Sequence, residues 1–450
     1  MKKALISLLW GFIFSIFILL PAMEVKAGDF YYPPDDDGRL IVVLDPGHGG
    51  SNLGADYNGF VEKEMNLVVA KAMAEELRKY EGITVYLTHE DADTEMSLAE
   101  RAEFAANVNA DFLFCLHFNM SPGNILYGSE VWISAFGEEN RQGYSFAALQ
   151  LNEMKNLGLS IRGIKTRLND KGTDYYGILR ECTNNGIPAA LIEHCHIDHD
   201  ADVGFCDSTE DLIALGQADA DAVAKFFRLH SDSLMVDYSN FEDTVKVSPD
   251  MLYAGMDTTD PDICIIEEAY ADVSAGKIGV QVTGCDYDSP MQYYAYSLDG
   301  GETYTPYLLW PDADLIAGTS PDTFLLEIDV PVGMSPSVIV KAVNQYDRFT
   351  ESNLLTGFPV FMEEDIVMAG ETDVNDTDVS EGNFKWKDEI SPDPDGGFRA
   401  PEKKETNADD TFAIFLKICL FGVLGIFLLI LLLSGVWSRR HHGKRRKRKK

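Results

Sequence analysis

The chain has 450 residues, 46% of them hydrophobic, and a formal net charge of −36 at pH 7. This length and apolar content allow two or three domains with substantial cores and exclude a wholly disordered protein. The acidity excludes long-range attraction to nucleic acid, so contact with any anionic polymer requires a local pocket. Seven cysteines are too few for a disulfide framework in a chain of this size, and we expect them mainly as small hydrophobic residues.

The amino end predicts a signal peptide over residues 1–27. Two lysines are followed by an apolar run, and Val25-Lys26-Ala27 places small residues where a signal peptidase cleaves. The run is long for a signal peptide, so an uncleaved signal anchor is the alternative.

The carboxyl end predicts one transmembrane helix. Residues 412–437 are apolar apart from Lys417 and long enough to cross a hydrocarbon core of about 30 Å. Residues 438–450 form a strongly basic tail, which the positive-inside rule places in the cytoplasm. We therefore expect a single-pass protein of the cell membrane, anchored by its C-terminal helix, with the preceding domains extracellular.

After an acidic lead-in at residues 28–38, strand and helix patterns alternate over residues 39–232. A capping box, Ser97 with Glu100, marks the start of one of these helices. Such alternation predicts an α/β sandwich with a mixed or mostly parallel sheet and helices on both faces. After a first strand from Leu40, strand patterns occur at 83–87, 112–116, 127–134 and 189–192, and helix patterns at 64–80, 98–107, 140–157 and 209–228.

Residues 240–362 change to an all-β texture. Strand-like runs at 277–283, 292–298, 324–330 and 337–343 are separated by Gly, Pro and Asp clusters, which predicts a smaller all-β sandwich domain. The pieces YAYSLDGGETY and VIVKAVNQYDRFTESN resemble parts of immunoglobulin-like or fibronectin-type-III-like modules. Residues 363–411 are acidic, with few apolar residues, and predict a disordered linker.

Candidate functional residues follow the predicted strands. The stretch LIVVLDPGHGGSNLG carries His48 to the rim of the sheet, Glu62 precedes the first helix, and His117 ends another strand. Two imidazoles and a carboxylate are the ligand set of a catalytic zinc site with an open fourth position. Glu193, at the end of a further strand, is the candidate general base. Singly, each has an ordinary interpretation, such as a turn histidine, a first-turn acid or a core histidine.

Four motifs carry a family resemblance, and they occur in the family's order and spacing. DPGHGG, EKEMNL, LAERAEFAANVNADFLFCLHFN and GILRECTNNGIPAALIE resemble the zinc-dependent N-acetylmuramoyl-L-alanine amidases of the amidase type 3 family. The resemblance implies that His48, Glu62 and His117 bind Zn²⁺ and that Glu193 is catalytic. It also implies hydrolysis of the amide between N-acetylmuramic acid and L-alanine in peptidoglycan.

The chain departs from the family pattern at three places. Cys115 replaces a serine, His89 replaces an arginine, and HCHIDHDAD follows Glu193 in place of the usual segment. Two alternatives therefore stay open: a catalytically degenerate muropeptide-binding protein, and a zinc peptidase acting on another cell-wall amide. The histidines of the altered segment also raise the hypothesis of a second metal site, formed by His194, His196 and His199.

Overall fold

The computed structural model of the protein describes residues 40–242, 256–363 and 384–385. The predicted signal peptide, acidic lead-in, transmembrane helix, basic tail and most of the linker lie outside these residues. None of the helices in the described ranges is both long and apolar enough to cross a bilayer. All described residues belong to one compact unit of the chain.

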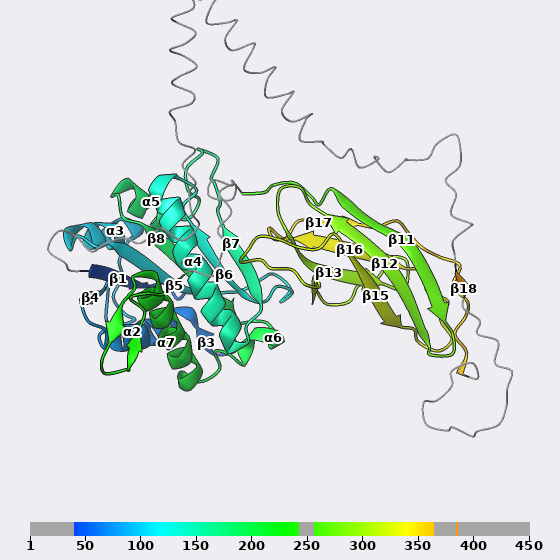
Figure 1. Cartoon of the computed structure of the whole chain (residues 1–450), viewed down its shortest axis with the longest axis horizontal. Helices are drawn as coiled ribbons and strands as arrows, with labels where there is room; N and C mark the ends of the chain where they lie inside the picture. Colours follow the sequence, from blue (N-terminus) through cyan, green and yellow to red (C-terminus); the bar gives the residue numbers. More distant parts are fainter. Residues whose placement is uncertain (1–39, 243–255, 364–383, 386–450) are drawn as a thin grey trace, which may run out of the picture. The chain divides into compact units, whose positions relative to one another are not determined.

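A six-stranded sheet forms the centre of the first domain, with strand order β4-β1-β5-β8-β6-β7 (Figure 1). Neighbouring strands run parallel except β6 and β8, which are antiparallel. The predicted mixed sheet is therefore confirmed. The strands span Leu40–Pro46 (β1), Ile83–Leu87 (β4), Phe112–Asn119 (β5), Ser129–Ile133 (β6), Ile161–Lys165 (β7) and Ala189–His196 (β8).

Helices cover both faces of this sheet, as predicted. Phe112, Phe114 and Phe146 stack in the core on one face, with ring centroids 4.5–5.6 Å apart. Ala102 and Leu179 are buried in a separate core on the other face. The first face is covered by α2 (Glu62–Leu77), α4 (Gly137–Leu157) and α7 (Thr209–Phe226), and the second by α3 (Leu98–Asn107) and α5 (Gly177–Asn184).

Local sequence explains several element boundaries. The capping box is confirmed, because Ser97 Oγ accepts a hydrogen bond from Glu100 N and the Glu100 side chain accepts one from Ser97 N. Gly158 ends α4 in the left-handed conformation, with φ of 104°. The short remaining elements of this domain are β2 (Asp56–Tyr57), β3 (Phe60–Val61), α6 (Asp200–Val203), β9 (His230–Ser231) and β10 (Val236–Asp237).

The second domain, here called the β-domain, consists of two antiparallel four-stranded sheets that share one core. Their orders are β15-β12-β11-β18 and β14-β13-β16-β17. One strand, β18 (Phe384–Lys385), pairs with β11 although it lies within the segment predicted as a linker. The other strands span Ile263–Asp272 (β11), Lys277–Cys285 (β12), Met291–Ser297 (β13), Leu308–Leu309 (β14), Thr323–Asp329 (β15), Ile339–Asn344 (β16) and Phe349–Glu351 (β17).

The six cysteines in the described ranges are free, and five of them are buried. Cys264 and Cys285 lie on adjacent strands, but Cys264 is opposite Gly284 and Cys285 is opposite Ile263. Residues offset by one position point to opposite faces of a sheet, so this pair is not placed to form a bridge.

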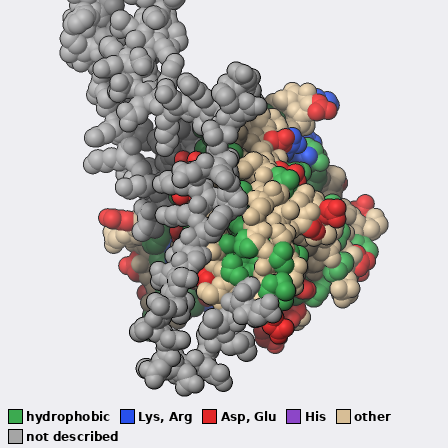
Figure 2. Space-filling model, turned by 90° about the vertical axis from the view of Figure 1, so that its right-hand side faces the viewer, with side chains coloured by type: hydrophobic (Ala, Val, Ile, Leu, Met, Phe, Trp, Pro, Cys, Tyr) green, Lys and Arg blue, Asp and Glu red, His purple; other side chains and the backbone are tan. Residues whose placement is uncertain are grey.

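The acidic composition is visible on the surface. On the face drawn in Figure 2, Asp and Glu side chains are scattered among hydrophobic patches, while Lys and Arg side chains are few.

Candidate active site

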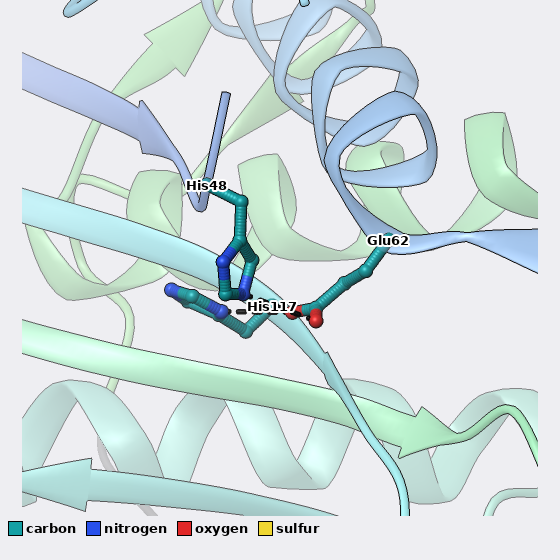
Figure 3. Close-up of side chains that lie close together, drawn as sticks. All are labelled: His48, Glu62 and His117. Carbon is teal, nitrogen blue, oxygen red and sulfur yellow. Dashed lines mark hydrogen bonds and ion pairs between the residues drawn. The ribbon is translucent and has the colours of Figure 1, made fainter. Parts of the chain in front are cut away.

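His48, Glu62 and His117 meet at the carboxyl ends of β1 and β5 (Figure 3). His48 lies in the turn after β1, His117 lies in β5, and Glu62 is the first residue of α2. Glu62 Oε2 is 3.0 Å from His48 Nε2, and Glu62 Oε1 is 2.8 Å from His117 Nδ1. One ligand atom from each residue lies within 4.8 Å of the others. We call this group the ligand triad.

Two glycines make room for the triad. A Cβ atom at Gly47 would lie 2.3 Å from the His117 ring, and one at Gly54 would lie 2.4 Å from Glu62 Oε2. Gly54 also has a φ of +72°, and His48 itself adopts a φ of 67°. A non-glycine residue in this left-handed region is uncommon and often marks a functional turn. The glycine-rich sequence after β1 is therefore required by the close approach of the three side chains.

A buried carboxylate, Asp45, helps to hold the turn after β1 through Arg101. Asp45 is fully buried, and its Oδ1 accepts a hydrogen bond from Arg101 Nη1 at 2.6 Å. Arg101 also donates to the backbone carbonyls of Pro46 and His48. Cys115, the first departure from the family pattern, donates its thiol to Asp45 Oδ2 at 3.1 Å. The cysteine thus supplies a hydrogen-bond donor at this position.

The second departure also has a structural role. His89 is buried, and its ring nitrogens lie 2.9 Å from the carbonyl oxygens of Pro46 and Asp91. His89 therefore links the turn after β1 to the loop after β4.

The electrostatics of the triad favour a charged Glu62. Burial opposes its ionisation, but hydrogen bonds from His117 and His48 outweigh burial and hold the pKa of Glu62 well below its usual range. The backbone amides of Ala55 and Phe118 also donate to this carboxylate, at 2.7 and 3.1 Å. Burial lowers the pKa of His48, yet contact with Glu62 raises it overall. A carboxylate with two imidazole nitrogens is a donor set that fits Zn²⁺.

Glu193 lies beside the triad. It is opposite His117 in the β5–β8 pair and opposite Glu130 in the β8–β6 pair. Its Oε2 is buried, with no hydrogen-bond partner among the described residues. Burial, followed by the negative charges of Glu62 and Glu130, raises the pKa of Glu193 well above its usual range. This carboxyl group is therefore free to exchange a proton.

Glu130 is the centre of a buried cluster that sequence reasoning missed. Its Oε2 accepts hydrogen bonds from Arg162 Nε at 2.8 Å and Lys165 Nζ at 2.7 Å. Its Oε1 accepts from Trp132 Nε1 at 3.1 Å and Asn119 Nδ2 at 2.9 Å. Burial opposes the charge of Glu130, but Lys165 and Arg162 outweigh it and hold its pKa far below the usual range. The sequence signal was the pair of cations in the short segment IRGIK.

The three histidines of the altered segment have different partners. His194 lies between His117 O, at 2.9 Å, and Asp219 Oδ2, at 2.7 Å. His196 is 3.6 Å from Asp202, and His199 caps α6. Over the described ranges, groups of three potential metal ligands occur only at the triad and at Asp257, Asp286 and Asp288. The three rings therefore do not converge on one metal position among the described residues: His194 and His199 are engaged in hydrogen bonds, and His196 faces Asp202.

A cavity of about 370 Å³ adjoins the triad. His48 and His117 line it together with residues 95–98 at the start of α3. A substrate group that enters this cavity can therefore reach both imidazoles.

The fold and site define an α/β domain with a potential metal centre at the carboxyl ends of its strands. Residues 42–225 match the model of the Amidase_3 family, described as N-acetylmuramoyl-L-alanine amidase. The match runs from within β1 to near the end of α7 and so covers most of the first domain.

Individual relatives match part of the chain. The sporulation-specific N-acetylmuramoyl-L-alanine amidase of Bacillus subtilis is 29% identical over 193 residues, which cover 43% of this chain and 70% of that protein. The amidase AmiA of Escherichia coli is 36% identical over 129 residues, which cover 28% of this chain and 43% of AmiA. The crystal structure of an N-acetylmuramoyl-L-alanine amidase from Clostridium difficile 630 is 27% identical, covers 42% of this chain and 97% of that one, and has a TM-score of 0.37.

Proposed function

We propose that the protein is a zinc-dependent N-acetylmuramoyl-L-alanine amidase that cleaves peptidoglycan between N-acetylmuramic acid and L-alanine. One observation carries this proposal: the convergence of His48, Glu62 and His117, with the unpartnered carboxyl group of Glu193 on the adjacent strand. The family match of the first domain supports the same substrate.

His48, Glu62 and His117 are the residues that would hold zinc, through Nε2, a carboxylate oxygen and Nδ1. When bound, zinc supplies Lewis-acid chemistry, because it lowers the pKa of water and polarises the amide carbonyl. Asn52 Oδ1, 3.0 Å from His48 Nδ1, holds this ring in position. The backbone amides of Ala55 and Phe118 donate to Glu62 and fix the orientation of its carboxylate.

Glu193 performs the proton transfer in this mechanism. Its free Oε2 accepts the proton of the attacking water and returns it to the leaving nitrogen of L-alanine. Without a cation nearby, the raised pKa of Glu193 favours its protonated form; a divalent cation at the triad opposes that shift and favours the carboxylate.

The deciding experiment is mass spectrometry of the fragments released from intact peptidoglycan. We expect stem peptides with a free L-alanine amino group and glycan with an unsubstituted lactyl carboxyl group. Glu193→Gln should abolish turnover but retain zinc, whereas Glu210→Gln, at an exposed position in the first turn of α7, is the matched control and should cleave like the wild type.

Two other results would contradict the proposal. Fragments cut at a different amide would identify a zinc peptidase of another wall bond. Zinc binding and muropeptide binding without turnover would identify a degenerate binding protein.

We further propose that the protein is a single-pass protein of the cell membrane whose amidase domain acts outside the cell and whose C-terminus is cytoplasmic. The apolar run at residues 412–437 and the basic tail at 438–450 support this topology. The two antiparallel sheets of the β-domain are compatible with an immunoglobulin-like or fibronectin-type-III-like sandwich. Protease treatment of intact cells should remove the folded domains and leave the tail protected.

A further inference from the structure

A turn of the β-domain contacts the edge strand of the amidase sheet. This turn, residues 345–347 between β16 and β17, reaches β7 and the residue after it. Gln345 Nε2 donates to Ile164 O at 3.0 Å, and the Tyr346 hydroxyl accepts from Thr166 N at 3.3 Å. Edge strands expose unpaired backbone groups, and covering them is one way in which proteins protect such edges. The β-domain therefore supplies a hydrogen-bond partner to one carbonyl of β7 and to the first amide after this strand.

The same turn holds a buried cation of the amidase domain. Arg162 Nη2 donates to both carboxylate oxygens of Asp347, at 3.0 and 2.8 Å, and Nη1 donates to the Tyr293 hydroxyl at 3.1 Å. Only Nε donates to a residue of its own domain, Glu130. The Arg162 side chain is 2% exposed, and a guanidinium stays charged, so it requires counter-charges. Among the described residues, most of the hydrogen bonds that Arg162 donates are thus accepted by side chains of the β-domain.

Asp347 also balances the charge of the buried cluster. Arg162 and Lys165 carry two positive charges, and Glu130 supplies one negative charge. The carboxylate of Asp347 supplies the second. The Asp347 side chain is 35% exposed, but the two cations are only 1–2% exposed. Removing its charge therefore leaves an excess positive charge on buried groups, with Glu130 as the one anion among the described residues that contacts both cations.

Glu130 connects this cluster to the active site. It lies directly opposite Glu193, and side chains of opposite residues in an antiparallel pair project from the same face. Asn119, which donates to Glu130, is two residues after His117 in β5. A displacement of Glu130 therefore acts on the strands that carry both Glu193 and a triad histidine.

Hydrogen bonds within the β-domain fix the conformation of the turn, so the turn can hold Arg162 in place. Asn344 Oδ1 accepts from the amides of Tyr346 and Arg348, at 3.0 and 2.9 Å. Asn344 Nδ2 donates to Asp257 and Asp286, both at 2.8 Å. The turn is therefore held from within its own domain before it contacts Arg162.

We propose that the β-domain is a positioning element of the catalytic centre, in which Asp347 holds Arg162 against Glu130 and thereby keeps Glu193 in place beside the ligand triad. This inference rests on the proposed amidase function. Asp347 and Glu130 are positioning residues, since they act on Glu193 through the sheet.

The test compares Asp347→Asn with Asp329→Asn in the full-length protein. Asp329 is a matched control in the same domain, because its side chain is 86% exposed and its nearest cation, Lys277, is 3.7 Å away. We expect Asp347→Asn to lower kcat on a soluble muropeptide about 10- to 100-fold, since small misplacements of a catalytic group have effects of this size. Zinc content and KM should stay within about twofold of wild type, as for a change confined to the transition state.

Hydrogen exchange gives a second readout that does not depend on turnover. In Asp347→Asn, the backbone amides of β8 around Glu193 should exchange faster than in the wild type, while those of β4 at the far edge should not change. If the wild type cleaves no peptidoglycan, the proposed function fails, and the exchange of β8 alone then decides whether the β-domain positions this strand.

Two outcomes would overturn the inference. The first is wild-type kcat and wild-type exchange of β8 in Asp347→Asn. The second is a fall in kcat in folded Asp347→Asn that parallels the loss of zinc, which indicates that the contact supports metal retention and not the position of Glu193. If Asp347→Asn does not fold, Tyr293→Phe replaces it, because this change removes only the hydroxyl that accepts from Arg162 and donates to Tyr127 O. The same two readouts then apply.

Discussion

The ligand triad and the Glu130 cluster lie on the same sheet but differ in the exposure of their side chains and in the saturation of their hydrogen bonds. In the triad, the His48 and His117 side chains are 21% and 17% exposed. In the cluster, Glu130, Arg162 and Lys165 are 1–3% exposed, and both oxygens of Glu130 accept two hydrogen bonds each. An accessible donor set is suited to chemistry, whereas a saturated buried cluster fixes geometry. The difference predicts that mutations in the two groups have different consequences.

The largest expected effect is on activity, from a change in the triad. His48→Asn removes one imidazole but keeps a residue type that tolerates the left-handed backbone. We expect loss of bound zinc and a fall in kcat of at least about 10³-fold, because Lewis-acid catalysis contributes several kcal/mol. The free energy of unfolding of the metal-free protein should change by less than about 1 kcal/mol, as is usual near the surface. Metal analysis, kinetics and urea unfolding check this, and retained activity would contradict the zinc mechanism.

The next effect is on stability, from a change in the Glu130 cluster. Arg162→Met leaves Glu130 and Asp347 without their shared cation and should lower the free energy of unfolding by about 3–5 kcal/mol. Arg348→Met is the control, because this arginine is half exposed and its ion pair with Asp260 is worth at most about 1 kcal/mol. Chemical denaturation measures both losses. Equal losses of unfolding free energy in the two variants would contradict the prediction that the buried ion pairs of Arg162 contribute more than an exposed pair.

A smaller effect tests the contact between β7 and the β-domain. Gly163 has a φ of +92°, and a Cβ there would lie 2.2 Å from Gln345 Nε2 and 2.7 Å from Leu315 O. Gly172 has a φ of +72° with open space around it. Gly172→Ala should therefore show only the backbone penalty, about 1–2 kcal/mol, and Gly163→Ala should exceed it by about 1–3 kcal/mol of overpacking. Thermal unfolding of both variants measures the difference, and similar losses would argue against a tight interface.

The smallest expected effect is the change in the stability contribution of Glu130 at acidic pH. The pKa of Glu130 in the folded protein lies far below its usual value of 4.5, so this carboxylate stabilises the fold above that value and loses its contribution only as the pH falls toward the folded-state pKa. We expect the difference in unfolding free energy between wild type and Glu130→Gln to stay constant from about pH 8 to pH 5 and to shrink below about pH 4.5. Denaturant titrations at several pH values test this. A difference that already declines near neutral pH would show that Glu130 is not held by the two cations.

Sequence patterns anticipated the α/β domain well because its elements have strong local signals. The capping box at Ser97 and the end of a helix at residue 157 were readable from a few residues. Apart from elements of two to four residues, β7 and α5 are the elements of this domain that were missed. The segment IRGIK contains two cations, which argue against a buried strand unless an anion such as Glu130 lies beside them. Helix α5 is only eight residues long. The periodicity of so short a helix is weak.

The candidate site also has features that the sequence predicts and features that only the structure shows. The sequence by itself determined the four candidate residues, because side chains near the carboxyl ends of parallel strands meet at one edge of a sheet. The structure extends β5 and β8 beyond the predicted ends, so His117 and Glu193 lie within these strands. Only the tertiary structure decided that Glu130 pairs with Arg162 and Lys165, that His194, His196 and His199 each have a different partner, and that Asp347 completes the Glu130 cluster. The physical reason is that buried charges are satisfied by neighbours in space, and Asp347 lies 185 residues along the chain from Arg162.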